Sequence, residues 1–361
     1  MKKIRYILFY PEAEPSSFVK DVGMIPATLR KRYGYDAHLV CYENGLKRPY
    51  RSTILNGLRF LRENAESIDI LQLFHPIKRN VVWILYFKKK HPDGTVYLKL
   101  DADDRIITSV KGKRDLFHSL KRKMIRWLLT SPDLVTVESS EMSRRIEGYY
   151  GIRIPVLPNG FELAQNADDQ VKKEKIVLTV ARNGTYQKAT EVLLEAFVNA
   201  DLQEGWKLRL VGSMEESFVP RMNTFLKEHE AYADRIEYAG EIQDRRMLYK
   251  EYERAAVFAL PSRYESFGIV LAEALSRGCY LITTDHVPSA YDLIPDERFG
   301  EIVRTDCVQS LAKALKKAEK DMKEIESCKG LRMAYAGERF AWDGVCGKLE
   351  EYLKCLTGRM N

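Results

Sequence analysis

Short apolar runs alternate with longer amphipathic segments along the first half of the chain. The runs have the length of buried strands, and the segments between them place apolar residues at helical spacing. Strands that alternate with helices predict βαβ units and a parallel sheet. We expect strands at 4–10, 37–42, 68–74, 95–100 and 134–137, and helices at 18–33, 54–64, 80–90, 111–129 and from 139 or 140 to 149.

A second alternating set follows a polar stretch at 162–175, which has no clear period and predicts a linker. Strands are expected at 176–180, 207–211, 236–238, 256–260 and 279–283, and helices at 190–200, 219–229, 247–254, 269–277, 311–329 and 345–356. The length of 361 residues also favours two domains. We therefore predict an α/β protein with two Rossmann-like parallel-sheet domains, 1–163 and 164–340. If they face each other across a cleft, both present the carboxyl ends of their strands, where ligands bind.

The most specific pattern is a strand, loop and helix around Glu265 and Glu273. The loop ends at the predicted start of the helix, so the amides of Phe267, Gly268 and Ile269 should lack helical partners. Free amides and the helix dipole together form an anion site. Eight residues of helix would rise about 12 Å. The two carboxylates could then bracket an extended ligand, one binding sugar hydroxyls and the other ribose hydroxyls.

This segment reads Pro-Ser-x-x-Glu-x-Phe-Gly and then Glu-Ala-x-x-x-Gly. It resembles the Glu-x7-Glu signature of retaining GT-B glycosyltransferases, most closely glycosyltransferase family 4 (glycosyl transferases group 1). The resemblance extends over nearly the whole chain and implies the GT-B fold, with a final helix at 341–361 that returns to the N-terminal domain. It implies transfer of a sugar from a UDP- or GDP-sugar to an acceptor hydroxyl, in bacterial surface glycan synthesis. Such enzymes need no permanently bound cofactor and are thought to use front-face attack, with the leaving phosphate as the base.

Two cations, Arg182 and Lys188, lie in a loop between a predicted strand and a predicted helix. Cations fixed at that place can stabilise the charge that develops on a leaving diphosphate. In the resembling family an Arg and a Lys hold the diphosphate, and the position after the Lys is usually Gly where this chain has Ala189. The alternative is a pair of solvated surface cations. We predict that Arg182, Lys188 and Glu265 are the catalytic residues.

Weaker motifs add candidates for donor binding. Gly212 ends a strand, Gly240-Glu241-Ile242 matches the family segment that contacts the base, and Gly23 resembles part of the family's glycine loop without its usual Gly-Gly pair. The alternative is that each glycine serves only a backbone turn. The predicted donor-binding residues are Glu273, Ser266, Phe267, Gly268, Ile269, Gly212, Glu241, Ile242 and Gly23.

The family often has a catalytic His after the fourth strand, where this chain has Lys-Leu-Asp-Ala-Asp-Asp at 99–104. Asp101 is therefore a candidate for contacts to acceptor or sugar hydroxyls. His75 is another, or else a turn residue before Pro76. The acidic run could also bind a metal. Because Arg182, Lys188 and helix amides already supply positive charge, we predict no metal.

Charge is unevenly distributed along a chain whose formal net charge is +7. Residues 111–126 carry seven Lys or Arg against Asp115 alone, and the stretch to 129 also has an apolar face. That combination suits an anionic membrane surface and a lipid-linked acceptor. The alternatives are a core-facing helix with a solvated basic face, and nucleic acid, for which no recognisable binding module is present. We predict no nucleic-acid partner.

Composition indicates a cytoplasmic protein. Apolar residues make up 45%, no run is long enough to span a bilayer, and the N-terminus lacks a secretory signal. The six cysteines have no metal spacing and suit reduced thiols. If the basic segment touches lipid, the protein lies peripherally on the inner face of the membrane.

Three other functions remain open at this stage. A GT-B nucleotide-sugar epimerase would change a sugar without an acceptor, and a phosphorylase would need a pyridoxal-binding Lys and a longer chain. A non-catalytic nucleotide-sugar-binding scaffold of a transferase complex would explain the altered glycine loop and the missing His. The presence of Arg182, Lys188, Glu265 and Glu273 favours the transferase.

Overall fold

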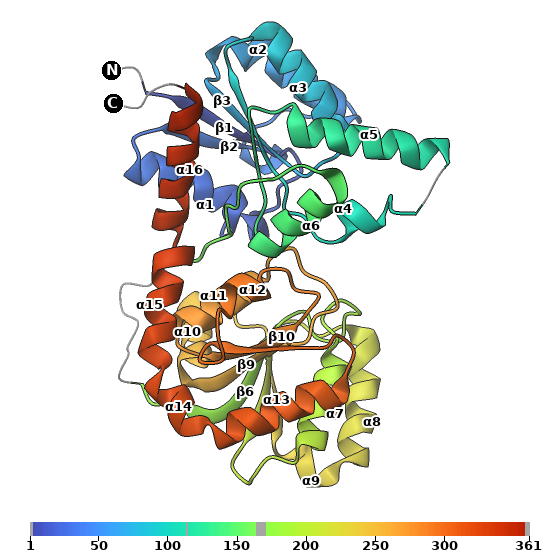
Figure 1. Cartoon of the computed structure of the whole chain (residues 1–361), viewed down its shortest axis with the longest axis vertical. Helices are drawn as coiled ribbons and strands as arrows, with labels where there is room; N and C mark the ends of the chain where they lie inside the picture. Colours follow the sequence, from blue (N-terminus) through green and yellow to red (C-terminus); the bar gives the residue numbers. More distant parts are fainter. Residues whose placement is uncertain (1–2, 113–114, 164–170, 358–361) are drawn as a thin grey trace. The chain divides into compact units, whose positions relative to one another are not determined.

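The computed structural model describes residues 3–112, 115–163 and 171–357, and the statements below concern these residues. The chain divides into two compact units, and Figure 1 shows the elements of both. Unit 1 comprises Met1–Glu162 with Phe340–Asn361, and unit 2 comprises Leu163–Arg339. Each unit contains one all-parallel sheet covered by helices. The predicted class of two Rossmann-like parallel-sheet domains is confirmed.

The sheet of unit 1 has the strand order β2-β1-β3-β4-β5. Its strands are β1 (Arg5–Phe9), β2 (Asp36–Val40), β3 (Ile70–Phe74), β4 (Thr95–Lys99) and β5 (Leu134–Thr136). Its α-helices are α1 (Asp21–Arg32), α2 (Thr53–Asn64), α3 (Lys78–Lys90), α4 (Arg105–Thr108), α5 (Leu116–Thr130), α6 (Ser140–Tyr150) and α16 (Trp342–Thr357). Short 3-10 turns are η1 (Pro15–Ser17), η2 (Tyr42–Asn44) and η3 (Ala65–Ser67).

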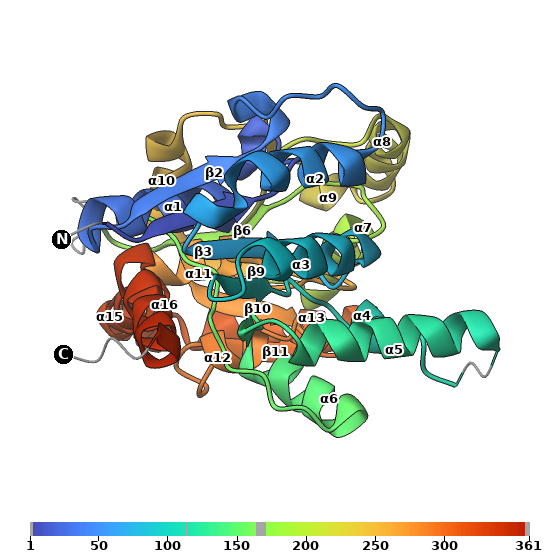
Figure 2. The same ribbon diagram turned by 90° about the horizontal axis from the view of Figure 1, so that it is seen from above.

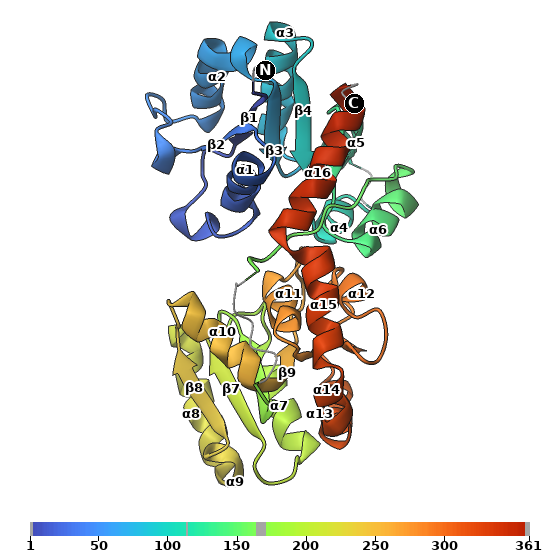
Figure 3. The same ribbon diagram turned by 90° about the vertical axis from the view of Figure 1, so that its left-hand side faces the viewer.

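Alternation along β1 assigns its side chains to two separate cores. Ile7 and Phe9 belong to the core under α2, α3, α5 and α6, whereas Tyr6 and Leu8 belong to the core under α1 and α16. This is the two-residue period of a strand buried on both faces. On the second face α16 packs beside α1, as Figure 3 shows, and the Tyr33 hydroxyl donates to the Asp343 carbonyl at 2.6 Å.

The sheet of unit 2 has the strand order β11-β10-β9-β6-β7-β8. Its strands are β6 (Glu174–Val180), β7 (Lys207–Val211), β8 (Ile236–Gly240), β9 (Ala255–Leu260), β10 (Tyr280–Thr284) and β11 (Gly300–Val303). Its α-helices are α7 (Thr190–Ala200), α8 (Val219–Glu228), α9 (Glu230–Ala233), α10 (Arg245–Arg254), α11 (Ile269–Ser276), α12 (Ala290–Leu293), α13 (Val308–Lys320), α14 (Met322–Ser327) and α15 (Lys329–Phe340). One 3-10 turn is η4 (Glu216–Phe218).

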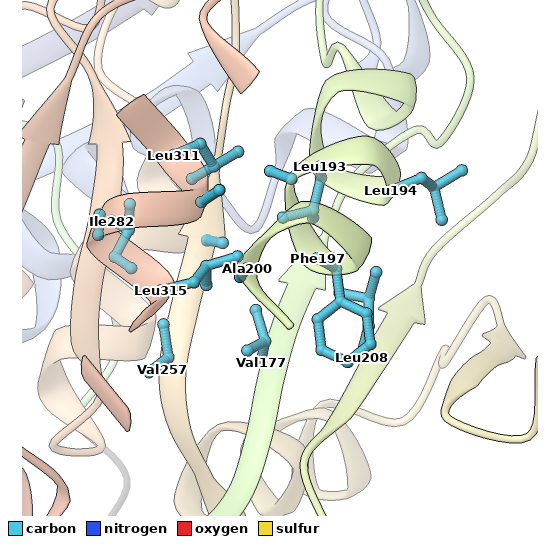
Figure 4. Close-up of a cluster of buried hydrophobic side chains, with 14 of the residues drawn as sticks. Val177, Leu193, Leu194, Phe197, Ala200, Leu208, Val257, Ile282, Leu311 and Leu315 are labelled. Atoms are coloured by element: carbon cyan, nitrogen blue, oxygen red, sulfur yellow. The ribbon is translucent and has the colours of Figure 1, made fainter. Parts of the chain in front are cut away.

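Helices α7 and α13 cover one face of this sheet. Figure 4 shows Phe197 of α7 and Leu315 of α13 over the side chains of β6, β7, β9 and β10. Each such fully buried side chain contributes roughly 1.5–3 kcal/mol to folding. On β9, Phe258 follows Val257 and points to the other face of the sheet, where its ring centroid lies 5.6 Å from that of Tyr252 of α10. Helices α10 and α11 pack on that face.

Two expectations about elements were wrong. The linker ends earlier than predicted, because Glu174 and Lys175 already belong to β6. Lys173 is buried, and its Nζ donates to the carbonyls of Tyr252 at 2.9 Å and Arg277 at 2.6 Å. The helix expected at 311–329 breaks at Asp321 into α13 and α14, which lets Ile325 join the core. Residues 164–170 of the predicted linker lie outside the described residues.

No helix in the described part of the chain combines the length and the apolar composition needed to cross a bilayer.

Candidate functional site

The carboxyl ends of β6 and β9 lie side by side at the centre of the sheet in unit 2. The chain leaves β6 toward β7 on one side and returns through β9 toward β10 on the other, so the strand order reverses between them. Ligands of open α/β sheets bind at such a point. The two loops that begin there are joined, because the Arg263 amide donates to the Gln187 carbonyl at 2.8 Å and Gln187 Nε2 donates to the Tyr264 carbonyl at 3.0 Å.

These loops bring together the three residues predicted to be catalytic. Lys188 Nζ is bonded to Glu265 Oε1, which also accepts from Ser262 Oγ at 2.8 Å. Gln187 connects the third residue to the pair, since it accepts from Arg182 Nη2 at 3.2 Å and donates to Glu265 Oε2 at 3.4 Å. Lys188 and Glu265 are largely buried, whereas Arg182 is exposed. The result is a largely buried ion pair with an exposed cation beside it.

Glu273 lies on α11 and is held by two residues that the sequence pattern did not indicate. Arg245 Nη2 donates to Glu273 Oε1 at 2.6 Å, and the Tyr252 hydroxyl donates to Oε2 at 3.2 Å. Burial and then the Glu273 charge raise the pKa of Tyr252 well above its ordinary value, so its hydroxyl stays a donor. Burial alone would lower the pKa of Arg245, but Glu273 and Tyr249 together outweigh burial, so the pKa is raised overall. The carboxylate is therefore anchored before any ligand arrives.

The N-terminus of α11 offers backbone donors next to this carboxylate. Gly268 is the N-cap residue with φ of 74°, a left-handed conformation that favours glycine, and no side chain caps the helix. Within the described residues, no group accepts from the amides of Gly268 or Ile269. Phe267 is fully buried and Ser266 half-buried. The helix start therefore presents its amides as the sequence predicted for Gly268 and Ile269.

The other donor-binding candidates in unit 2 lie at the same edge of the sheet, farther from its centre. Gly212 follows β7 with φ of 109°, and a Cβ there would lie 2.1 Å from the Ala181 carbonyl oxygen. Only glycine allows this approach of the β6 and β7 ends. Glu241 and Ile242 follow β8 and lead into α10, which carries Arg245. Glu241 is exposed and Ile242 is half-buried.

In unit 1 the segment that resembles the family's glycine loop is helical and does not form a loop. Gly23 is the third residue of α1, and its amide donates to the Lys20 carbonyl at 3.1 Å. A Cβ at Gly23 would lie 2.0 Å from the Phe18 carbonyl oxygen. The glycine is thus explained by close packing of the chain that enters α1.

The two weak candidates of unit 1, His75 and Asp101, stand at neighbouring strand ends. The His75 amide donates to the Lys99 carbonyl at 3.0 Å. Both residues have left-handed backbones, with φ of 65° and 40°, which costs about 1–3 kcal/mol for residues other than glycine. Glu138 fixes the second turn, since its carboxylate accepts from the amides of Asp101 at 2.8 Å and Ala102 at 3.0 Å. Such strained positions concentrate at functional sites.

Beneath these turns lies a buried ionic cluster that sequence analysis missed. Lys99 Nζ contacts Glu138 Oε1 and Asn159 Oδ1, both at 2.7 Å, and Asp21 Oδ2 at 3.7 Å. Burial, opposed by Lys99, raises the pKa of Asp21 to about 6. Burial lowers the pKa of Lys99, but Glu138 and then Asp21 outweigh it and raise it overall. One signal was available: a lysine inside an apolar strand is rarely buried unless it is paired.

The acidic run at 101–104 does not converge on one point. Asp103 accepts from Arg105 Nε at 2.9 Å, and Asp104 accepts from Arg145 Nη1 at 2.7 Å. Among the described residues, no group of three or more His, Cys, Asp or Glu side chains is arranged to hold a metal.

Comparison with known proteins agrees with this geometry. Residues 162–332 match the family model for glycosyl transferases group 1. The amylovoran biosynthesis glycosyltransferase AmsD of Erwinia amylovora is 24% identical over 295 residues, which cover 76% of this chain and 78% of the relative. The N-acetylgalactosamine-N,N'-diacetylbacillosaminyl-diphospho-undecaprenol 4-alpha-N-acetylgalactosaminyltransferase of Campylobacter jejuni is 28% identical over 235 residues, 63% of this chain and 60% of the relative.

Solved structures share the fold over the whole chain. Sucrose-phosphate synthase from Thermosynechococcus elongatus has a TM-score of 0.75 at 17% identity, covering 99% of this chain and 100% of that one. Anabaena Alr3699/HepE in complex with UDP and glucose has a TM-score of 0.72 at 14% identity, covering 98% and 100%. The protein is therefore a glycosyltransferase of the GT-B fold, and its residues 162–332 match the model of glycosyl transferases group 1.

Proposed function

We propose that this chain moves a sugar from a nucleotide-diphosphate-sugar to an acceptor hydroxyl, with retention of the anomeric configuration. The observation that carries the proposal is the Lys188–Glu265 pair, held where the strand order reverses and next to the start of α11. Glu273 follows on the same helix, already fixed by Arg245. Cations, free amides and two anchored carboxylates at one sheet edge match the two ends of such a donor.

Each group has a distinct part in binding the donor. Arg182, Lys188 and the amides of Gly268 and Ile269 stabilise the leaving diphosphate, because charge placed beforehand need not reorganise during the reaction. Glu273 binds the ribose hydroxyls, and Glu265 binds the donor sugar. Further donor contacts come from the loops that contain Ser266, Gly212, Glu241 and Ile242, and from the first turn of α1 at Gly23.

The transfer itself requires no side-chain nucleophile. The bond between the sugar C1 and the diphosphate oxygen breaks while the acceptor oxygen bonds to C1 on the same face. The acceptor proton passes to the leaving phosphate oxygen, and the nucleoside diphosphate departs. Because Arg182, Lys188 and the helix amides supply the positive charge, we propose that the reaction is independent of metal. Asp101 and His75 are the proposed contacts to acceptor or sugar hydroxyls.

Names of related proteins support narrower choices of substrate. The HepE structure was determined with UDP and glucose, AmsD is named for amylovoran biosynthesis, and the Campylobacter relative is named for a diphospho-undecaprenol acceptor. We propose a UDP-sugar as the donor, with a GDP-sugar as the alternative. The proposed acceptor is a lipid-linked glycan of a bacterial surface polysaccharide. We place the reaction at the cytoplasmic face of the membrane.

The test measures thermal stabilisation and donor hydrolysis with UDP-, GDP-, ADP- and dTDP-sugars, first with chelator and then with magnesium. We expect one donor class to stabilise the protein and to be hydrolysed slowly with chelator present. Lys188→Ala and Arg182→Ala should each lower turnover by roughly 10²–10³-fold, the usual loss when a donor to a developing anion is removed. Lys313→Ala, which removes an exposed lysine on α13, is the control.

Sugar transfer that survives both Lys188→Ala and Arg182→Ala would refute the proposed mechanism. Stabilisation by a donor without hydrolysis or transfer would favour the scaffold, and a changed sugar without an acceptor would favour the epimerase. The anomeric coupling of the product, measured by proton NMR, tests retention.

A further inference from the structure

The start of α5 exposes apolar side chains that the rest of unit 1 does not cover. Leu116 is 76% exposed, Phe117 70% and Leu120 56%. Farther along the helix, Ile125, Leu128 and Leu129 are buried in the core of unit 1. Figures 1 and 2 both show the first turns of α5 extending past the neighbouring helices. A cluster of large exposed apolar side chains marks an interaction site.

The exposed residues share one apolar stripe of α5 with two partly buried residues farther along the helix. At about 100° per residue, Leu116, Phe117 and Leu120 fall within one sector of roughly 100°. Met124 and Trp127 continue this sector and pack against the core. The helix is thus amphipathic along its whole length, but only its second half has a partner within unit 1. Ile125, Leu128 and Leu129, at roughly 180°, 120° and 220° from Leu116, bury the adjoining side of the helix in the core, so the stripe itself is left exposed at the start of α5 for another partner.

The polar surroundings of this stripe are cationic. Lys121 follows Leu120 directly, and the exposed Lys123 lies about one helical turn after Leu120. Asp115 is the single acid of residues 111–130 in the sequence. It caps α5 by accepting from the His118 amide at 3.0 Å, and hydrogen bonds from His118 lower the pKa of Asp115. Its charge is thus engaged locally. We call the surface formed by five residues the α5 tip: Leu116, Phe117, Leu120, Lys121 and Lys123.

We propose that the α5 tip docks this protein on a lipid bilayer rich in anionic headgroups. The apolar side chains would enter the boundary between headgroups and acyl chains, while the lysines would stay at the level of the lipid phosphates. Charge complementarity selects this occupant, because cations flanking an apolar stripe match an anionic surface over an apolar layer. The inference deepens the proposed function and rests on it for one point, the lipid-linked acceptor.

Vesicle binding tests the α5 tip without donor, acceptor or turnover. The full chain is sedimented with equimolar phosphatidylglycerol–phosphatidylcholine vesicles and with pure phosphatidylcholine vesicles. We expect clear preference for the anionic vesicles and weaker binding at about 1 M salt, where the Debye length falls from about 10 Å to 3 Å. Lys121→Gln/Lys123→Gln should lower the affinity roughly thirtyfold, since each lysine near the surface contributes about fivefold.

Matched variants separate the α5 tip from general surface effects. Phe117→Gln/Leu120→Gln should lower vesicle affinity more than about tenfold. Val219→Gln/Leu331→Gln removes two other exposed apolar side chains and should bind as the wild type does. Lys313→Gln/Lys320→Gln, which removes two exposed cations of α13, should lose little. Gln is a good helix former, so the helices should persist; circular dichroism checks each variant.

Equal binding to both vesicle types, or equal losses in the tip and control variants, would overturn the proposal. The proposal would also be overturned if the wild type bound no vesicles but self-associated, and Phe117→Gln/Leu120→Gln abolished that association. The α5 tip would then join two copies of the chain. If vesicle binding fails while donor hydrolysis is intact, only the proposed role of the α5 tip is rejected. Vesicle binding without donor hydrolysis or transfer rejects only the proposed function.

Discussion

Replacing Asp21 with Asn should make unit 1 more stable at neutral pH. Asp21 is buried beside Lys99 and Glu138, and its Oδ2 has no hydrogen-bond donor among the described residues. Burial, partly offset by Lys99, raises its pKa from 3.8 to about 6. The folded state therefore prefers the neutral carboxyl, which an Asn side chain resembles in shape. The Asn oxygen can still accept the Val22 amide hydrogen bond that Asp21 Oδ1 accepts at 3.0 Å.

The magnitude follows from the pKa values. The rise from 3.8 to about 6 corresponds to about 3 kcal/mol, at ~1.4 kcal/mol per pKa unit. Because the folded pKa is raised, ionisation of Asp21 opposes folding. That destabilisation is absent below the unfolded pKa, grows as pH rises, and is complete above about 6. We expect Asp21→Asn to add about 2–3 kcal/mol to the free energy of unfolding near neutral pH and about 1 kcal/mol near pH 4.5.

Urea unfolding followed by tryptophan fluorescence measures this change. Trp83, Trp127 and Trp342 belong to unit 1. With a urea dependence of ~1–3 kcal/mol per molar, the midpoint should rise by roughly 1 M near neutral pH. A lower midpoint for Asp21→Asn, or a gain that is the same at both pH values, would refute the reasoning.

A second aspartate provides a control of opposite sign. Burial alone would raise the pKa of Asp285, but hydrogen bonds from Thr305 outweigh it and lower it. Its charge therefore favours folding above its ordinary pKa, and that stabilisation is lost as pH falls through the lowered value. Asp285→Asn should reduce the stability of unit 2 near neutral pH and have little effect in acid.

Three further substitutions test local geometry. Ala189 has φ of 49°, so Ala189→Gly relieves about 1–2 kcal/mol of backbone strain, but it also loses a buried methyl and adds chain freedom of similar size. Its melting temperature should therefore stay within about 3 °C of the wild type. In Gly184→Ala the new methyl would lie 2.3 Å from Phe218 Cβ, so this variant should lose more than about 2 kcal/mol of stability. Glu273→Gln should weaken donor binding roughly tenfold by calorimetry, while Glu253→Gln, which alters the partner of Arg277, should not. Arg263→Ala removes bonds to the Tyr186 carbonyl at 2.7 Å and to Glu191 at 2.8 Å that hold the Lys188 loop in place, so kcat should fall several-fold with little change in donor affinity. An unchanged kcat, or the same loss in Arg298→Ala, would contradict that role.

Local signals predicted most of the fold. Apolar runs located the strands from β1 to β10, and Gly34 and Gly278, both with positive φ, ended helices where expected. The four-residue β11 was missed because Glu301 interrupts a short apolar run. The helix α15 was missed because it begins at Lys329, one residue after α14 ends at Ser327, with no residue of the usual capping types immediately before it to mark its start. The break at Asp321 comes from packing of Ile325, which no local pattern reveals.

The candidate site was predictable only in part, for a physical reason. The loop after β9 could be read as a unit because its residues are consecutive. The pairing of Lys188 with Glu265, and of Arg245 with Glu273, joins residues far apart in the sequence and depends on strand order. Glu265 also lies in the loop, and α11 begins only at Ile269, so the expected eight residues of helix between the carboxylates were an overcount.

The position of α16 in unit 1 has a consequence for synthesis of the protein. Residues 1–162 leave the ribosome first, but Val345, Leu349 and Leu353 complete the core against Ile25 and Leu29 of α1. Unit 2 is continuous and can finish folding before α16 has been translated. The first unit to begin is thus the last to be completed, and until then its α1 face remains an uncovered apolar surface that a chaperone would recognise.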